Sequence, residues 1–311
     1  MSDMGYKKFN IILVMFVILL IGIEPIYALD IDSQAGTSGA KFLKIGLGAR
    51  SIGLGGAFVS VADNLDSIYY NPAGLINITL PTISLSHTEW LTDISIQNIS
   101  YLQPTEIGNF AGSILYLHMG DIVARDTSGE PIGIFSSYVI VGNIAYSKEI
   151  VERIKAGINF KMFYETIEQE KEIGFAFDIG GLYSNLLISN LNLGLCLQNI
   201  GPQVKFIKES APLPLNLKSG ISYSLFENSL LLSTEFNIPR DNKPYFNVGI
   251  EYNLKKRLSF RVGYTGRNDF AQGITAGLGI NIVNWNIDYA YVPYGNLDST
   301  HRITISTSFG E

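Results

Sequence analysis

Three histidines and one cysteine are the side chains of this sequence best suited to act as a catalytic base or nucleophile. His87 and His301 fall near the ends of predicted strands that are far apart, and His118 falls where a long predicted loop begins. Cys196 has no second cysteine to pair with, and the sequence holds no Gly-x-Ser-x-Gly pattern of a serine hydrolase. Since no nucleophile has a base at a defined spacing, we predict no catalytic residues and a protein that is not an enzyme.

Four aspartates could be imagined around a cation. They are Asp63 and Asp66, with Asp30 and Asp32 before them, but no EF-hand-like loop frames them. Acidic residues on a helix or in a solvated linker have the same appearance. The single cysteine excludes a disulfide framework and a multi-cysteine metal site. We therefore expect no metal site and no cofactor.

A glycine-rich stretch at residues 46–56 suggests a phosphate-binding loop at first sight. The dinucleotide pattern needs a glycine five residues after its first, and those places hold Ser51 and Phe58. No Gly-Lys-Ser/Thr follows either. These glycines instead predict tight backbone turns and close packing, for instance inside the lumen of a barrel.

The composition places these residues in an unusual protein of 311 residues. Only 16% of them are Asp, Glu, Lys or Arg, against about 25% in soluble domains, yet 47% are apolar and mean hydropathy is +0.21. This much apolar content excludes a disordered chain, and a net charge of −6 excludes a basic nucleic-acid-binding domain. A β-protein whose surface does not face water fits this mixture.

The first 28 residues predict a cleaved signal peptide. Lys7 and Lys8 precede the apolar run Ile11–Ile23, and Ala28 stands at a small-residue cleavage position. Thirteen apolar residues make a helix about 20 Å long, too short for about 30 Å of bilayer hydrocarbon. We therefore expect export, with an N-terminal anchor helix as the alternative.

From about residue 82 onward, apolar residues recur with a period of two, as in strands. In the clearest run, 154–162, the even-numbered residues are apolar, while the odd-numbered ones are polar, charged or glycine. Counting such runs predicts 14 strands: 82–90, 93–102, 109–118, 138–147, 153–164, 174–184, 190–198, 215–225, 229–238, 245–253, 257–265, 273–282, 284–292 and 300–309.

The strands and their connections favour a transmembrane barrel. Most predicted strands span 9–11 residues, the length that a tilted strand needs to cross a bilayer. Gaps after odd-numbered strands are often long, at 119–137, 165–173 and 199–214, whereas gaps after even-numbered strands are short. A soluble β-sandwich would also account for each strand taken alone, but it gives no reason for long gaps after odd-numbered strands and short gaps after even-numbered ones. We predict an all-β fold, a 14-stranded antiparallel transmembrane β-barrel over 82–311, in the outer membrane.

Charged residues on the strands share the polar phase, which a polar lumen requires because a charge facing lipid is costly. Such charges could form a selectivity constriction, or pair with one another and with the segment that precedes the barrel. The predicted lumen-lining residues are Lys155, Lys161, Asp178, Lys218, Glu235, Glu251, Arg261 and Asp288.

Residues 29–81 do not alternate, and we expect them to fold back into the pore as a hatch, or plug. A wide barrel of 14 strands needs its lumen occupied to avoid leaking. Candidate hatch or gate residues combine the turn-forming glycines, a basic residue and the Asn-Pro-Ala-Gly element. They are Arg50, Gly53, Gly55, Gly56, Asn71, Pro72, Ala73 and Gly74.

The same segment resembles a known family. Lys41–Gly46, Gly53–Val59, Ala62–Asp63 and Asn71–Leu75 look, in this order, like the N-terminal signature of the PorV/PorQ proteins, which belong with the FadL-type outer-membrane barrels. The resemblance implies a 14-stranded barrel with an N-terminal hatch. In FadL-type transporters, hatch movement and a lateral wall opening pass hydrophobic molecules. PorV-like barrels instead serve type IX secretion and hold exported proteins at the cell surface.

Two functions remain open at this point. We prefer passive transport of small hydrophobic compounds through a hatch-gated barrel, which an apolar pocket beside the hatch and an interrupted wall would favour. The alternative is a secretion component that binds exported proteins, which a sealed wall with large ordered loops would favour. Expected partners are outer-membrane lipid and either a hydrophobic small-molecule ligand or secreted proteins and secretion-system components, with no nucleic acid.

Overall fold

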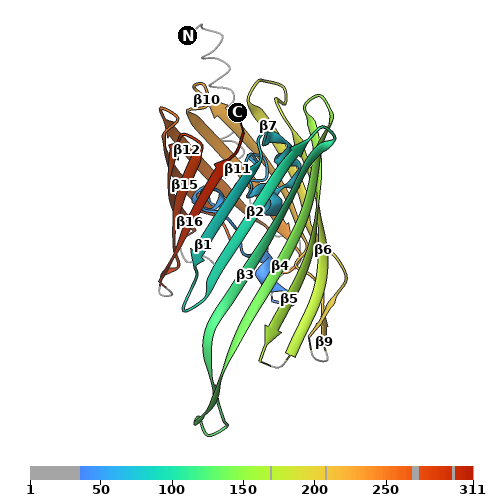
Figure 1. Cartoon of the computed structure of the whole chain (residues 1–311), viewed down its shortest axis with the longest axis vertical. Coiled ribbons are helices and arrows are strands. Elements are labelled where there is room, and N and C mark those ends of the chain that lie inside the picture. Colours follow the sequence, from blue (N-terminus) through green and yellow to red (C-terminus); the bar gives the residue numbers. More distant parts are fainter. Residues whose placement is uncertain (1–35, 169, 207–208, 268–272, 296–297, 311) are drawn as a thin grey trace.

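The structure is a closed antiparallel β-barrel of 14 strands (Figure 1). It is a computed structural model, and it describes residues 36–310 except 169, 207–208, 268–272 and 296–297. The predicted signal peptide, residues 1–28, lies outside the described residues. The barrel strands are β1 (Thr82–Glu89), β2 (Ser95–Thr105), β3 (Gly108–Arg125), β4 (Pro131–Val151), β5 (Ile154–Ile167), β6 (Glu170–Tyr183), β7 (Leu191–Ile200), β10 (Asn216–Leu225), β11 (Leu230–Pro239), β12 (Tyr245–Leu254), β13 (Leu258–Thr265), β14 (Ile274–Ile282), β15 (Trp285–Pro293) and β16 (Ser299–Ser308).

Each barrel strand pairs with its neighbours along the chain, and β16 pairs back with β1 to close the wall. Closure leaves no free strand edge where the barrel crosses hydrocarbon, so backbone groups there find partners within the wall. The predicted fold class and strand number are confirmed. No helix among the described residues is long and apolar enough to span a membrane.

Alternation along each strand sorts the side chains between lipid and lumen. On β5, Ile158 is 55% exposed, whereas the neighbouring Asn159 is fully buried. In a soluble barrel the exposed phase would be polar. Here it is apolar, as Ile144, Ile179 and Val262 also show. The exterior of the wall is therefore suited to hydrocarbon.

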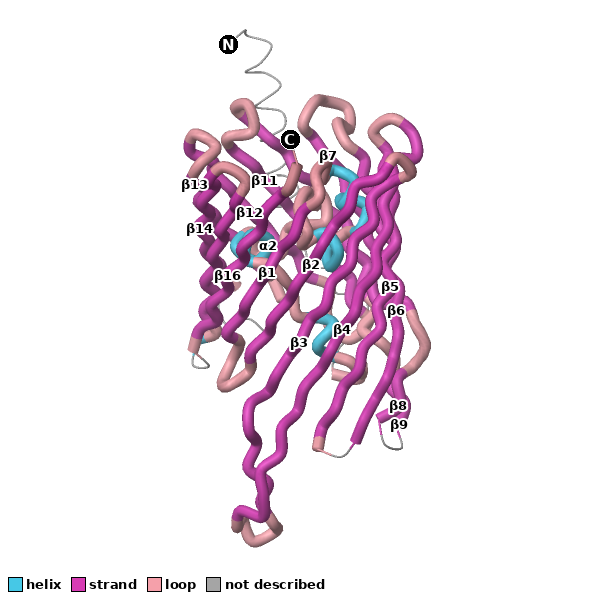
Figure 2. Tube along the Cα trace, in the orientation of Figure 1, coloured by secondary structure: helices cyan, strands magenta, loops and turns pink. Residues whose placement is uncertain are grey.

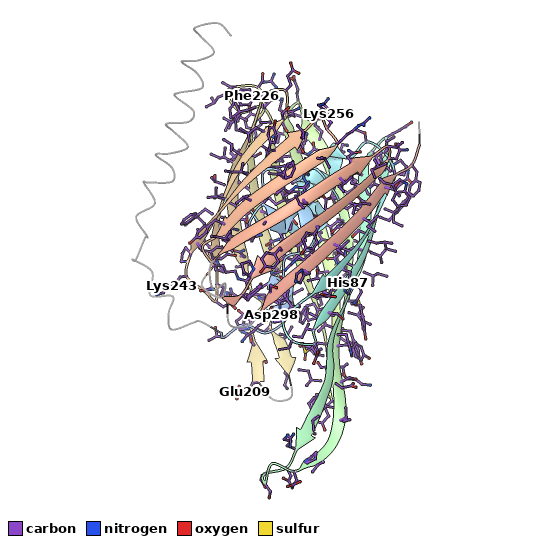
Figure 3. The ribbon with its side chains drawn as sticks, turned by 90° about the vertical axis from the view of Figure 1, so that its left-hand side faces the viewer. His87, Glu209, Phe226, Lys243, Lys256 and Asp298 are labelled. Carbon is purple, nitrogen blue, oxygen red and sulfur yellow. The ribbon has the colours of Figure 1, made fainter. Side chains whose placement is uncertain are left out.

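The two ends of the barrel differ. At one end, here called the turn end, short connections such as 226–229 and 255–257 join the strands. At the other, the loop end, connections include 201–215 and 266–273. Figure 3 shows Phe226 and Lys256 at the turn end, with Lys243 and Asp298 at the loop end. The predicted segregation of loop lengths by strand parity is present only in part, since the loop-end connection 168–169 is short and the turn-end connection 184–190 has seven residues.

Two of the predicted long loops are wrong. Residues 119–137 mostly continue β3 and β4 as a ribbon beyond the loop end, and 165–173 mostly continue β5 and β6 (Figures 1 and 2). A register shift between His118 and Asp121 on β3 breaks the alternation, which is why the sequence pattern stopped at 118. His118 therefore lies inside a strand. The third predicted loop, 199–214, contains a hairpin of β8 (Val204–Phe206) and β9 (Glu209–Ala211).

Residues 36–81, called the hatch from here on, fill the lumen (Figure 2). They contain four short helices, η2 (Lys41–Lys44), α2 (Ala49–Gly53), α3 (Ser67–Tyr70) and η3 (Pro72–Asn77). Gly39 donates a backbone hydrogen bond to Pro212 in the β7–β10 connection at the loop end. Asn109, at the turn end of β3, donates to the carbonyls of Leu75 and Ile78. The hatch therefore crosses the barrel from loop end to turn end before β1 begins.

Aromatic rings on the outer face mark where the wall meets the membrane interface. Tyr116, Tyr138 and Tyr164 on neighbouring strands have ring centroids 6.0 and 6.1 Å apart. Nearer the turn end, Phe110 and Tyr146 have centroids 4.9 Å apart. Such girdles flank the apolar band of a membrane barrel. On β4, Ile144 lies between the two girdles, and Ile134 lies beyond the first.

Replacing Ile144 by Lys should therefore lower the free energy of unfolding by about 1–3 kcal/mol, because this side chain lies within the apolar band, between its middle and the girdle of Phe110 and Tyr146. Ile134→Lys, on the same strand and the same face, should cost about 0–1 kcal/mol. Urea unfolding in lipid vesicles, followed by the gel shift between boiled and unboiled samples, measures both. Equal losses for the two variants would contradict this assignment of the membrane band.

Candidate functional site

The hatch lies directly against the inner wall, over a row of inward-facing strand glycines. A Cβ at Gly263 would stand 2.0 Å from the backbone nitrogen of Gly55, and one at Gly194 would stand 2.2 Å from the carbonyl oxygen of Val59. Side chains at these positions would push the hatch away from the wall. The glycines of this row are Gly157, Gly180, Gly194, Gly220, Gly249, Gly263 and Gly277.

Glu235 on β11 holds the hatch turn at residues 58–59. Its Oε2 accepts hydrogen bonds from the backbone nitrogens of Phe58 and Val59, at 3.0 and 2.8 Å. Its Oε1 lies 3.3 Å from Nζ of Lys218. The buried carboxylate thus satisfies two backbone donors of the hatch and one cation of the wall.

The Asn-Pro-Ala-Gly element organises the second half of the hatch. The Asn71 side chain accepts from the backbone nitrogen of Ala73 and donates to the carbonyls of Val59 and Gly181, at 2.7 and 3.0 Å. Pro72 then begins η3. A Cβ at Gly74 would stand 2.0 Å from the Ala62 carbonyl, so only glycine fits. This element joins two parts of the hatch to β6.

Arg50 on α2 ties the hatch to the wall through a chain of charges. Its Nε and Nη2 donate to the two carboxylate oxygens of Glu251 at 2.8 and 3.0 Å, and its Nη1 donates to Asp63. Glu251 also accepts from Arg261 at 2.5 Å, and Arg261 donates to Asp288 at 2.6 Å. This chain, the ionic network, alternates in sign across α2, β12, β13 and β15. It brings together four of the predicted site residues, which the sequence placed no closer than ten positions apart.

The remaining predicted lumen charges also have partners. Lys161 lies 2.8 Å from Asp178 and donates to Asn199 at 2.8 Å. Lys155 donates to Asn77 of the hatch at 2.5 Å. Lys218 also stands 4.8 Å from the ring centroid of Tyr70, a hatch residue. Of the two roles considered for these charges, pairing with each other and with the hatch is the arrangement present. Gly53, Gly55 and Gly56 line the hatch where it meets β12 to β14.

Asp66 is the hatch carboxyl whose charge is most sensitive to pH. Burial raises its pKa to about 6, although hydrogen bonds from its neighbours oppose that rise. Its backbone nitrogen donates to Asn64 at 3.0 Å.

A cavity lies on each side of α2, with Ile52 lining one and Arg50 lining the other, and the ionic network lines the second. The loop-end cavity, of about 70 Å³, is lined by hatch residues such as Tyr70 and by Trp90, Lys218 and Arg302. The turn-end cavity, of about 390 Å³, is lined by Arg50, Asp63, Glu251, Arg261 and by polar residues of the wall. α2 thus lies between the two cavities, and the ionic network ties it to the wall.

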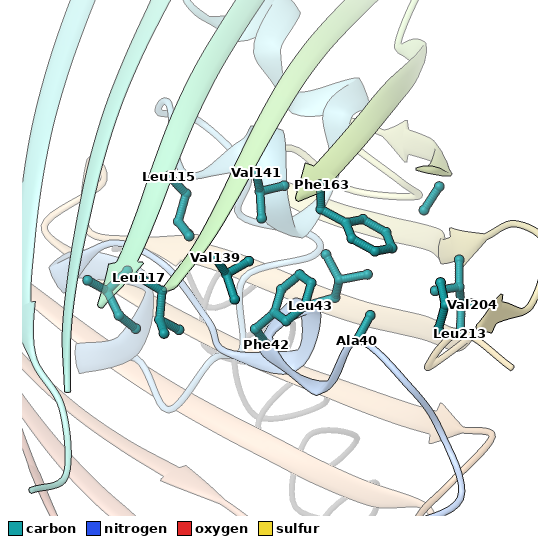
Figure 4. Packing of buried hydrophobic residues seen from close by; sticks show 12 residues of the cluster. Ala40, Phe42, Leu43, Leu115, Leu117, Val139, Val141, Phe163, Val204 and Leu213 are labelled. Carbon is teal, nitrogen blue, oxygen red and sulfur yellow. The ribbon is translucent and has the colours of Figure 1, made fainter. Parts of the chain in front are cut away.

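An apolar strip covers the inner wall at the loop end, and residue-by-residue reading of the sequence missed it. Most of its wall residues come from β3, β4 and β5, with Ile96 of β2 and Ala176 of β6 beside them. Phe42 and Leu43 of the hatch pack on this surface (Figure 4). The signal was present, since Val139-Ile140-Val141 is apolar in both phases and so faces both lipid and lumen. The inward-facing members are Leu115, Leu117, Val139, Val141 and Phe163.

The three histidines do not meet. His87 contacts Gln97 at 3.3 Å, His301 contacts Tyr289 at 2.7 Å, and His118 stacks near Tyr116. Cys196 is buried. Within the described part of the chain, no three His, Cys, Asp or Glu side chains gather as a metal site would require. Asp30 and Asp32 lie outside the described residues.

Comparison with known proteins finds solved structures of similar fold. No protein-family model matches the chain, and no curated protein matches its sequence. Solved structures do match. The toluene transporter TodX of Pseudomonas putida has a TM-score of 0.61 and 12% identity, covering 84% of this chain and 96% of that one. A Pseudomonas aeruginosa FadL homologue has a TM-score of 0.56 and 9% identity, covering 85% and 98%. The CymD monoaromatic hydrocarbon channel has a TM-score of 0.56 and 13% identity, covering 86% and 98%.

At these identities the likeness is one of fold. The chain has the FadL/TodX-like architecture of a 14-stranded outer-membrane barrel with an N-terminal helical segment. The predicted FadL-type barrel fold is therefore confirmed, and the outer-membrane location stays a prediction that this fold supports. The narrower resemblance to PorV/PorQ stays a prediction.

Replacing a glycine of this row by alanine should displace the hatch from the wall. Gly263→Ala places a Cβ against the Gly55 backbone, so we expect larger conductance in planar lipid bilayers than for the unmodified protein. Gly142→Ala is the matched control, because its Cβ would meet nothing nearer than 3.9 Å. If Gly263→Ala conducts like Gly142→Ala, close hatch-to-wall contact does not seal the lumen.

Proposed function

We propose that the protein is a passive outer-membrane channel for small hydrophobic compounds, gated by movement of its hatch, and that it is not an enzyme. The observation that carries this proposal is the position of α2, which the ionic network ties to the wall, between two cavities. Both cavities already exist on either side of α2, so a modest displacement of the hatch joins them. Bonds between charged side chains can break and re-form with solvent more readily than strand pairing can.

The closed wall argues for a route along the barrel axis. Backbone pairing joins every neighbouring pair of strands, with register shifts at β3–β4, β4–β5 and β6–β7. A lateral exit would require an interrupted wall, and a sealed wall is the feature that we expected of a protein-binding barrel. The transport proposal therefore rests on the cavities and the apolar strip. Passage requires that the hatch give way.

The apolar strip supports a hydrophobic cargo. Leu117, Val139 and Phe163 form an inner surface at the loop end. Phe42 and Leu43 of the hatch cover it, together with Val204 and Leu213 of the β7–β10 connection. Moving η2 would expose that surface to an entering solute. The solved structures of similar fold include a toluene transporter and a monoaromatic hydrocarbon channel, and neutral aromatic compounds are therefore the first cargo to test.

Replacing Arg50 by Gln tests the gate. The variant removes the hatch end of the ionic network while Arg261 still neutralises Glu251. In cells that display the protein in their outer membrane, we expect toluene uptake to exceed that of an empty-vector strain several-fold. Arg50→Gln should raise it further and admit a small polar dye.

Arg153→Gln is the matched control, because Arg153 is half exposed at the turn end and its ion pair is with the neighbouring Glu152. It should behave as the unmodified protein does. Toluene uptake no faster than in the empty-vector strain would overturn the proposal. Equal dye entry in the Arg50→Gln and Arg153→Gln variants would show that the ionic network does not hold the gate closed.

One feature favours a second function, protein binding at the cell surface as in a secretion system. The ribbon of β3 and β4 projects past the loop end, where its outer face carries Val123, Ile132 and Ile134 (Figure 1). Ile132 and Ile134 are 68% and 70% exposed. An exposed apolar face on an ordered ribbon is typical of a surface that contacts another protein.

Shortening this ribbon separates the two functions. Replacing residues 121–134 by a two-residue turn should leave toluene uptake unchanged, because the ribbon lies outside the barrel wall. If the protein is a secretion component, cells with the shortened ribbon should release exported proteins from their surface into the medium. If surface retention in the native host persists, the ribbon has no such role.

A further inference from the structure

One connection at the turn end carries three consecutive cations. Lys255, Lys256 and Arg257 join β12 to β13, and all three side chains are exposed (Figure 3 labels Lys256). Among the described residues, no carboxylate lies within ion-pair distance of any of them. This segment is called the basic turn from here on, and its charge is available to a partner outside the chain.

The other strand connections at the turn end, all of which the structure describes, have a different charge. Glu106 and Glu227 stand in two of them, and in a third Glu152 lies 3.2 Å from Arg153. The remaining two hold no charged residue. Positive charge on the connections at this end of the barrel is therefore concentrated in the basic turn.

The basic turn borders a groove of about 480 Å³ on the outer face of the wall, called the outer groove. Lys255 and Arg257 line this groove, whereas Lys256 lines the turn-end cavity inside the lumen. The turn thus directs two cations outward and one inward. The rest of the groove lining is mostly aliphatic and exposed, and consists of Leu254, Leu258, Ile280, Asn281, Ile282 and Val283.

Aromatic side chains place the outer groove at the edge of the apolar band. Tyr252 and Phe260 pair on the outer face, one step from Leu254 and Leu258 on the membrane side. Trp285, also on the outer face, pairs with Ile282 of the groove. Such rings mark the membrane interface of a barrel. The groove therefore runs from the apolar band to the level of lipid head groups.

An aliphatic floor with cations at its outer edge matches the chemistry of a phospholipid. Acyl chains cover aliphatic side chains, and a phosphate beyond them accepts two parallel N–H bonds from an arginine and a point charge from a lysine. A zwitterionic head group adds a cation of its own, which Lys255 and Arg257 repel. Charge complementarity therefore favours an anionic head group.

We propose that the outer groove is a binding site for an anionic phospholipid such as phosphatidylglycerol. Lys255 and Arg257 bind its phosphate, and its acyl chains lie along the aliphatic floor of the groove. This inference requires that the barrel stand in a membrane. It does not depend on the transport proposal, because lipid binding can be measured without flux.

Trp285 provides the readout, because it lies beside the groove and faces lipid. The other tryptophan, Trp90, packs against Arg302 and Tyr294 on the inner side of the barrel, so lipid leaves its fluorescence unchanged. The full chain is placed in phosphatidylcholine vesicles, and part of the lipid is replaced by phosphatidylglycerol or phosphatidylcholine with the same brominated acyl chains. We expect brominated phosphatidylglycerol to quench Trp285 at a several-fold lower mole fraction than brominated phosphatidylcholine does.

The double variant Lys255→Gln with Arg257→Gln should lose this preference. Lys256→Gln is the matched control, since it removes the same charge one position away but from the lumen side. It should quench as the unmodified protein does. Glycerol 3-phosphate in solution should not relieve the quenching beyond sodium chloride at equal ionic strength, because it lacks the acyl chains that the groove covers.

Folding of each variant is checked by the gel shift of the unboiled sample. If the double variant does not fold, the salt dependence in the unmodified protein replaces it, and the preference for phosphatidylglycerol should fall as salt rises. The proposal is overturned by equal quenching from the two lipids, by a preference that salt does not weaken, or by one that persists in the folded double variant. Loss of the preference in Lys256→Gln, or displacement by glycerol 3-phosphate, would also overturn it.

Discussion

Backbone hydrogen bonding inside hydrocarbon is the constraint on which the rest of this structure depends. A strand edge facing lipid would leave N–H and C=O groups without partners, so the wall must close, and pairing of β1 with β16 closes it. Closure with 14 strands creates a wide lumen. Every second side chain on each strand then faces that lumen, which must be filled with something other than lipid.

The hatch fills the lumen by two kinds of contact with different properties. Contacts over the glycine row, such as Gly55 against Gly263, are short-range and depend on backbone shape. Contacts through Glu235 and the ionic network are electrostatic and satisfy buried donors. The first kind determines where the hatch lies, and the second determines how firmly it is held. A gate needs both, because a plug without defined contacts would leak and one without breakable contacts would not open.

Prediction from sequence succeeded where the local pattern carries the information. Alternation placed Lys161 and Asp178 on the lumen phase because the period of a strand is two whatever its neighbours are. It failed at residues 119–137, where the shift after His118 changes the phase within one strand. It also failed at Leu117 and Val139, because an apolar residue facing the lumen contradicts the usual division between lipid and pore.

The sequence by itself determined the strands, their number, their phase and the segment that precedes them, because these follow from periodicity and glycine content along the chain. Only the tertiary structure decided which side chains meet. Arg50 reaches Glu251 across 201 positions, and Arg302 reaches Gly46 across 256. Such pairs depend on closure, on strand register and on the path of the hatch, which together bring remote strands around one segment. No local pattern records that arrangement.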